Sequence, residues 1–353
     1  MRIRGTLVVI ALLVAVSAVA QPALRLPEQS PAATVGQTIG ITDVNVTYHR
    51  PAVNKRKIFG GLVPYGVLWR AGANENTTIS FSTPVKVEGQ SIPAGAYGLF
   101  MIPSASQWTV VLSKFTGDWG TYNYDQSEDA ARVTVTPQTT TDSQERMAFT
   151  FDDLTNNSAT AALRWEKLKV PLKIEVELPA TVRASIRSEL RGGKHWNSDA
   201  WAAAARYELR NGDVDTALKY ADHALALGNT TGALRTKAAV LEKKGDVKGA
   251  AELRDRAKQN YNESEALNYV AFGLINDKKY DDAITYLNNF IASHPNSSQS
   301  WLAYSILGQA YSEKGDQAKA REAFNKAMAA SQQESDRVTV QDFLNSIGAE
   351  GKM

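Results

Sequence analysis

The spacing of apolar residues along the chain changes once, near residue 180. Before that point, apolar and polar side chains alternate, and turn residues such as Glu88-Gly89 and Pro93-Ala94-Gly95 separate the alternating runs. Successive side chains of a strand point to opposite faces, so this pattern predicts about nine short strands, each with one apolar face. We therefore expect an all-β, sandwich or barrel-like domain at residues 37–178.

From Trp196 onward the apolar period is that of helices, and the sequence repeats itself at intervals of about 34 residues. Each unit carries a turn residue and an alanine five positions later: Gly212 and Ala217, Gly245 and Ala250, Lys278 and Ala283, Gly315 and Ala320. This pattern resembles the tetratricopeptide repeat, whose unit is a pair of antiparallel helices. The resemblance implies an all-α helical-repeat solenoid at residues 196–330, with a capping helix or tail at residues 331–353.

Residues 179–195 separate the two patterns. Val182, Ile186 and Leu190 would share one helical face, and Gly192-Gly193 would end that helix. We expect a linker helix here.

One stretch of the β-rich region, residues 50–81, mixes glycine, proline, aromatic and charged residues too densely for a helix or a simple strand. In it, Trp69-Arg70 precedes a polar loop that contains Asn74 and Glu75. One interpretation is a recognition loop in which Arg70 offers its planar set of donors to a ligand. The other is an internal Arg70–Glu75 pair that fixes the loop. The candidate ligand-binding residues of the region are Arg50, Lys57, Trp69, Arg70, Asn74, Glu75 and Trp119.

Four tryptophans of the β-rich region differ in their setting. Trp108 and Trp165 fall in phase with the apolar faces of their strands, which predicts that they belong to the core. Trp119 lies in the loop Thr116–Tyr122, outside any alternating run. It would either stack on a ligand ring or close the open end of a sandwich.

Three motifs in this region carry a family resemblance: Y-x-R-P at Tyr48–Pro51, K-I-F-G-G-L-V-P-Y-G-x-x-W-R-x-G-A-N-E at Lys57–Glu75, and V-E-G-x-x-I-P-A-G-x-Y-x-L-F-x-I-P at Val87–Pro103. They resemble the bacterial envelope family called domain of unknown function 2911, over roughly Val35 to Leu178. The resemblance implies a secreted β-rich module. It supplies no established activity and no catalytic residues.

The N-terminus has the three parts of a secretory signal. Arg2 and Arg4 are positive, Leu7–Val16 is a short apolar core, and Ala18-Val19-Ala20 is a small-residue cleavage site. We therefore expect a signal peptide at residues 1–20, a tether at residues 21–36, and a periplasmic or secreted protein. No later stretch approaches the ~20 apolar residues of a membrane-spanning helix, so no membrane insertion is expected after cleavage.

The amino-acid composition and motifs argue against several kinds of chemistry and partner. The chain has no cysteine, which excludes disulfides, thiol chemistry and a lipid-modified N-terminal cysteine. Cleavage after Ala20 would remove two arginines and leave 37 Asp and Glu residues balanced by as many Lys and Arg residues, which argues against a nucleic-acid partner. The four histidines show no metal-ligand spacing, and no nucleophile elbow, phosphate loop or dinucleotide motif occurs. We expect no metal, cofactor or catalytic residue.

Three classes of function fit these features. The first is a non-catalytic interaction protein of the envelope, whose repeats bind a partner protein or peptide and whose β-domain binds a second partner, a small ligand or a glycan. The second is a hydrolase of envelope glycans or peptides that uses Glu75 or Asp118 with Arg70. The third is a structural scaffold. The repeat is the element with a known use, which favours the first class.

The signal pattern predicts that the mature chain begins at Gln21. Intact-mass measurement of the protein purified from the cell envelope should give the mass of residues 21–353. A mass that includes Met1 would contradict the assignment.

Overall fold

The computed structural model describes residues 26–117 and 119–349, and the chain divides into two compact units between Ser185 and Ile186. The predicted signal peptide lies outside the described residues. Within the described ranges, no helix is both long enough and apolar enough to cross a membrane.

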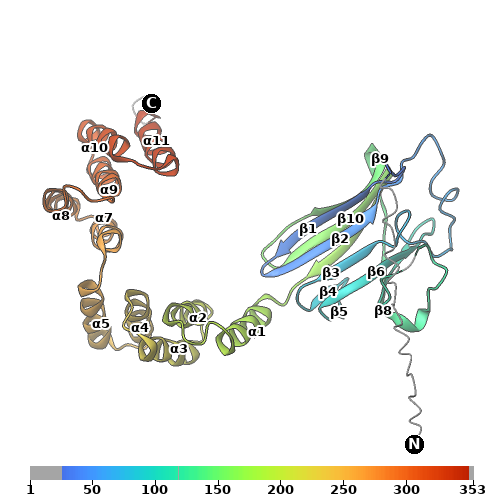
Figure 1. The fold of residues 1–353 in the computed structure, drawn as a ribbon, viewed down its shortest axis with the longest axis horizontal. Coiled ribbons are helices and arrows are strands. Elements are labelled where there is room, and N and C mark those ends of the chain that lie inside the picture. Colours follow the sequence, from blue (N-terminus) through green and yellow to red (C-terminus); the bar gives the residue numbers. More distant parts are fainter. Residues whose placement is uncertain (1–25, 118, 350–353) are drawn as a thin grey trace, which may run out of the picture. The chain divides into compact units, whose positions relative to one another are not determined.

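The first unit consists of two antiparallel sheets (Figure 1). The six-stranded sheet has the order β1-β2-β3-β6-β7-β8, and the four-stranded sheet has the order β5-β4-β10-β9. The strands are β1 (Ala32–Ile39), β2 (Thr42–His49), β3 (Thr78–Phe81), β4 (Val85–Val87), β5 (Gln90–Ile92), β6 (Gly95–Ile102), β7 (Trp108–Ser113), β8 (Asp129–Val135), β9 (Gln138–Asp152) and β10 (Ser158–Glu175). The predicted all-β class is confirmed.

The core of this unit lies between the two sheets and is built from the alternating residues. Val44, Val46 and Tyr48 of β2 are buried, while the residues between them are exposed. Tyr48 packs edge-on against Phe149 of β9, with ring centroids 4.9 Å apart, and its hydroxyl oxygen accepts a hydrogen bond from the Phe149 amide. Trp108 and Trp165 are fully buried, as their phase predicts.

Two boundaries differ from the expected ones. Residues 32–36 of the predicted tether form the first part of β1, which pairs with β2 along its whole length. This strand was missed because its inward positions begin with the small Ala33 and then Val35, which give a weak hydrophobic period. The apolar runs at residues 161–165 and 172–178 were expected to be separate strands. Instead, the single long strand β10 contains the first run and most of the second, and its register with β9 shifts around Glu166.

The second unit is built of helices in antiparallel pairs, such as α9 and α10 in Figure 1. The helices are α2 (Ser198–Arg210), α3 (Val214–Leu227), α4 (Thr231–Lys243), α5 (Val247–Gln259), α6 (Glu263–Ala266), α7 (Phe272–Asn276), α8 (Tyr280–Ser293), α9 (Ser300–Glu313), α10 (Gln317–Ala330) and α11 (Glu334–Ala349), with a π-helical segment at Leu267–Ala271 between α6 and α7. The predicted helical-repeat class is confirmed.

The residues that define the repeat have the backbone roles expected of them. Gly212, Gly245 and Gly315 lie in the turns with positive φ, and Lys278 adopts the same region with φ of 59°. Small residues allow the paired helices to approach closely. A Cβ atom at Gly308 of α9 would come within 2.6 Å of the Phe324 ring on α10. Phe324 in turn stacks on Phe343 of α11, which occupies the segment expected to cap the solenoid.

Helix α1 (Leu178–Arg191) follows β10 and ends before the turn at residues 192–197. We predict that the chain consists of two independently folding units joined near this turn. Trypsin should cut the mature chain first at Arg191 or Lys194, which are both exposed. The products should be two stable fragments, one β-rich and one helical by circular dichroism. First cuts elsewhere, or fragments that lose their structure, would contradict this prediction.

Candidate functional site

The outer face of the six-stranded sheet, which points away from the core, is partly covered by the segment between β7 and β8. A Cβ atom at Gly98 of β6 would meet the Phe115 carbonyl oxygen at 2.4 Å, and Phe100 of β6 packs edge-on against Tyr124, with ring centroids 5.4 Å apart. Trp119 forms a backbone bridge with Glu75. Side chains that would otherwise face solvent are therefore enclosed between the sheet and this segment.

The loop at residues 70–77 carries polar groups beside this segment, to which it is joined by the Glu75–Trp119 bridge. Ala71 and Asn74 both have positive φ, of 51° and 53°, and the Thr77 hydroxyl closes the loop by donating to the Ala71 carbonyl oxygen over 2.9 Å. This bond joins Ala71, which follows Arg70, to Thr77, which follows Asn76. We call Arg70, Glu75, Asn76, His49 and Trp119 the Arg70 cluster.

Arg70 is half-buried and lies against Trp119, with its guanidinium carbon 5.4 Å from the ring centroid. Its Nε atom is buried and has no hydrogen-bond partner among the described residues. Burial lowers the pKa of the guanidinium, and the nearby Tyr122 hydroxyl and Glu75 carboxylate offset this only in part. Arginine nevertheless stays protonated at neutral pH, so a half-buried positive charge is present here.

Asn76 is 6% exposed, and neither its Oδ1 nor its Nδ2 atom has a hydrogen-bond partner in the part of the chain that the structure describes. The register of β2 and β3 pairs Thr47 with Thr78, so the same alternation puts Asn76 on the outer face beside His49. Buried amide groups are nearly always hydrogen-bonded, and each exception calls for an explanation.

Glu75 pairs with a different residue from the one expected. Its Oε2 atom lies 3.3 Å from His49 Nε2, and Glu28 Oε2 lies 3.4 Å from the same nitrogen. Arg70 takes part in no ion pair of the described residues, so the predicted Arg70–Glu75 pair is wrong. The positive φ values at Ala71 and Asn74 redirect the chain, and Glu75 is thereby carried to the end of β2.

The other predicted site residues are divided among several places. Asn74 donates to Glu28 Oε2 and to the Ser30 carbonyl oxygen, and thus fixes the N-terminal segment to the loop. Arg50 donates to the Met147 carbonyl oxygen. Trp69 stacks on Trp165 in the core, with ring centroids 6.0 Å apart. These three residues have structural roles, although they were candidates for ligand binding.

Lys57 is exposed and lines a different cavity of about 490 Å³, together with Phe59, Tyr65, Trp108 and Glu166. No residue of the Arg70 cluster lines that cavity. The structure therefore brings together Arg70, Glu75 and Trp119 of the predicted set.

In the second unit, α2 and α4 form a face of small and basic residues. Ala203, Arg206 and Arg210 are exposed at positions i, i+3 and i+7 of α2. Arg206 donates to the Thr236 hydroxyl of α4 over 2.8 Å, which places the two helices side by side. Neither arginine pairs with a carboxylate in the described ranges of the chain.

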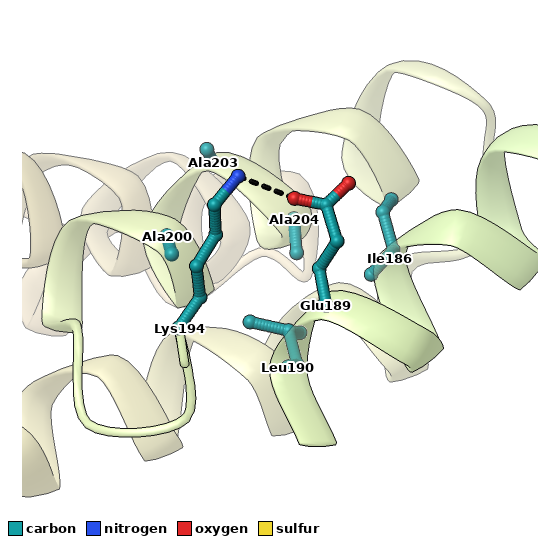
Figure 2. A pocket seen from close by; sticks show the side chains of 7 residues that line it. All are labelled: Ile186, Glu189, Leu190, Lys194, Ala200, Ala203 and Ala204. Carbon is teal, nitrogen blue, oxygen red and sulfur yellow. Dashed lines mark hydrogen bonds and ion pairs between the residues drawn. The ribbon is translucent and has the colours of Figure 1, made fainter. Parts of the chain in front are cut away.

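A pocket of about 210 Å³ continues this face toward α1. Figure 2 shows its lining, with Ala200, Ala203 and Ala204 from α2 opposite Ile186 and Leu190 from α1. The ion pair of Lys194 and Glu189 lies across the pocket. The pocket is thus lined mainly by apolar side chains and has one ion pair beside it.

Comparison with protein-family models agrees with both halves of this architecture. Residues 30–174 match the family described as "Protein of unknown function (DUF2911)", and residues 274–335 match a tetratricopeptide repeat model. A region that matches the DUF2911 model, called the DUF2911 region below, is therefore followed by a region that matches a tetratricopeptide repeat model. This agrees with the order of the two resemblances in the sequence. No curated protein matched the chain.

Solved structures that resemble the chain are repeat proteins. MamA from Desulfovibrio magneticus RS-1 is 21% identical with a TM-score of 0.27, and the match covers 43% of this chain and 93% of that one. PilF from Pseudomonas aeruginosa is 21% identical with a TM-score of 0.31, over 44% and 70% of the two chains. YrrB, described as a TPR protein with an unusual peptide-binding site, is 20% identical with a TM-score of 0.28, over 45% and 81%. These scores are too low to carry an argument about function.

Sequence reasoning missed two members of the Arg70 cluster in the DUF2911 region. His49 ends an alternating strand on its outward side, and Asn76 has the same outward phase at the start of β3. The alternation predicts solvent exposure for both. Asn76 is buried and His49 is partly covered by Glu28 and Glu75, which come from other parts of the chain, so the local alternation does not predict this cover.

The geometry predicts how Arg70 affects the stability of the DUF2911 region. Arg70→Met should raise the free energy of unfolding by up to about 1 kcal/mol, because it removes a half-buried charge that lacks an ionic partner. Lys57→Met, at an exposed cation of the same unit, should change it by less than about 0.5 kcal/mol. Urea denaturation of the mature chain, followed by tryptophan fluorescence, measures both.

A double-mutant cycle tests the pairing itself. Arg70→Ala and Glu75→Ala should be additive to within about 0.5 kcal/mol, because the two side chains form no ion pair. A loss of more than about 2 kcal/mol in Arg70→Ala, largely shared with Glu75→Ala, would show that the two residues pair after all.

Proposed function

We propose that this chain is an exported, non-catalytic adaptor whose repeat region binds an acidic segment of a partner polypeptide on the face formed by α2 and α4. The repeats make the region a protein-interaction module, and the signal pattern supports a periplasmic or secreted location. The observation that carries the proposal is the pair of exposed arginines, Arg206 and Arg210, beside the small residues of that face.

Within the described ranges, the two arginines of this face lack the carboxylate partner that many basic side chains of the repeat region have. Many basic side chains of the repeat region lie within ion-pair distance of a carboxylate: Lys237 with Asp222, Lys244 with Asp215, Arg254 with Glu242, Lys319 with Asp316, and Lys326 with Glu322. Arg206 and Arg210 have no such partner among the described residues. An uncompensated pair of guanidinium groups attracts carboxylates and can bind them through paired hydrogen bonds.

The neighbouring pocket favours a peptide that carries an apolar side chain. Ala203 belongs both to the α2–α4 face and to the pocket beside α1. Arg210 follows Ala203 by seven positions, which is about 10 Å along a helix axis. An extended peptide covers about 10 Å in three residues. The fitting segment therefore has an apolar side chain followed, about three residues later, by Asp or Glu.

The hydrolase alternative draws no support from the pairing in the DUF2911 region. It used Glu75 or Asp118 together with Arg70. Glu75 lies beside His49, and Asp118 lies outside the described residues.

The adaptor proposal is tested with an array of synthetic peptides of defined sequence, probed with the mature chain, residues 21–353. Peptides with an apolar residue followed three positions later by Asp or Glu should be enriched among those bound. Raising the ionic strength from about 0.05 to 0.5 M should weaken their binding, because the contacts are exposed charges.

The strongest peptide is then measured by fluorescence anisotropy against variants. Replacing both Arg206 and Arg210 by Glu should weaken binding by roughly tenfold or more. Arg321→Glu, at an exposed arginine on α10, is the matched control and should leave binding unchanged. Enrichment of basic peptides, or an equal loss with Arg321→Glu, would contradict the proposed face.

A further inference from the structure

We propose that the Arg70 cluster of the DUF2911 region is a binding site for a small organic molecule that carries one carboxylate on a ring. The site lies in the first unit, and the proposal is independent of peptide binding by the repeat region. The proposal is supported by two polar groups without partners, by the charges of the nearby carboxylates, and by a pair of exposed aromatic rings.

The first observation is the guanidinium of Arg70. It is half-buried, its buried Nε atom has no acceptor, and it forms no ion pair among the described residues. A charge held away from water without a counter-ion is unfavourable, and folded proteins normally supply the counter-ion themselves. The guanidinium lies over the Trp119 ring, with its carbon 5.4 Å from the ring centroid, and its planar donors could pair with a planar anion.

The second observation is the side-chain amide of Asn76, which is independent of any charge. It is more than nine-tenths buried, yet its donor and acceptor atoms are both unpaired. The Thr77–Ala71 hydrogen bond joins the residues that follow Asn76 and Arg70 in the sequence, so we place the two side chains at the same end of the loop. A ligand oxygen between the two residues would accept hydrogen bonds from both side chains, and so would satisfy two groups that the protein leaves unsatisfied.

The charges nearby favour a monoanion. Glu75 and Glu28 both lie within 3.4 Å of His49, and these two carboxylates face one imidazole. A dianion such as phosphate would be repelled by the carboxylates and would find a single guanidinium to neutralise it. A carboxylate has one charge, and its two oxygens match the planar donors of arginine.

The aromatic rings beside Arg70 favour a ligand with a flat face. Trp119 and Tyr122 are stacked in parallel, with an angle of 3° between their planes, and are 55% and 81% exposed. Exposed rings next to a polar site offer surface on which a sugar or aromatic ring can stack. The ligand class is therefore a ring that carries a carboxylate, either a sugar acid or an aromatic acid.

Isothermal titration calorimetry of the mature chain tests this class with defined probes. Glucuronate and benzoate represent the two kinds of ring acid, acetate has the charge without the ring, and glucose and benzamide have the ring without the charge. At least one ring acid should bind saturably, at least tenfold more tightly than acetate, with no saturable binding of the neutral probes. Glucuronate and benzoate together decide which ring is preferred.

Variants assign the binding to the cluster. Arg70→Met and Asn76→Leu should each weaken binding of the preferred ring acid at least tenfold, and Arg70→Lys should weaken it because the planar donor pair is lost. Circular dichroism and urea denaturation show whether each variant stays folded. Lys57→Met in the same unit, and the double Glu variant of Arg206 and Arg210 in the repeat region, are controls that should bind normally.

Three results would overturn the proposal. They are no saturable binding of either ring acid to the wild-type chain, tighter binding of inorganic phosphate than of both ring acids, or unchanged binding in a folded Arg70→Met variant. The double Glu variant of Arg206 and Arg210 separates this outcome from failure of the adaptor proposal, because it affects peptide binding alone.

Discussion

The cover of the outer sheet face by the segment between β7 and β8 is the constraint that governs the candidate site in the first unit. A sheet in a sandwich has one face for the core, and its other face normally meets water. Here Phe100 is almost fully buried on the outer face, where Tyr124 packs against it. Trp119 of the same segment lies against the guanidinium of Arg70, and Asn76 at the same end of the sheet is buried. In solvent, these polar groups would be hydrated and would need no partner.

The unpaired polar groups lower the stability of the first unit, and the same groups are the ones proposed to bind a ligand. Groups such as Asn76 Oδ1 and Nδ2, when buried without partners, cost about 1–3 kcal/mol each relative to hydrated ones. Packing in the sandwich core offsets this loss of stability. That packing includes the stack of Trp69 on Trp165, on the inner side of the sheet. Preorganised polar groups bind a complementary ligand without further rearrangement, so a cost in the free protein becomes affinity in the complex.

The sequence predicted those features that depend on local pattern. Alternation identified the inward side chains Val44, Val46 and Tyr48, and the spacing of Gly315 and Ala320 identified the helical hairpin of α9 and α10. It did not predict the contacts that depend on a turn. The separation of Arg70 and Glu75 along the chain allowed a pair, but the left-handed backbone of Ala71 and Asn74 prevents it. Alanine rarely adopts that conformation, so the sequence did not indicate it. The burial of Asn76 was equally hidden, because its outward phase in the strand predicts exposure.

The two proposed binding surfaces differ in their chemistry: the one in the first unit would take a single carboxylate, and the one on α2 and α4 is open and basic. The site in the first unit rests on the claim that Arg70 and Asn76 lack partners until a ligand arrives. A crystal structure of the mature chain with and without benzoate or glucuronate tests this claim directly. We predict a ligand carboxylate at about 2.7–3.1 Å from the guanidinium of Arg70 and the amide of Asn76, and no carboxylate at that place in the free protein. A carboxylate of the chain itself paired with Arg70 in both crystals would contradict the account.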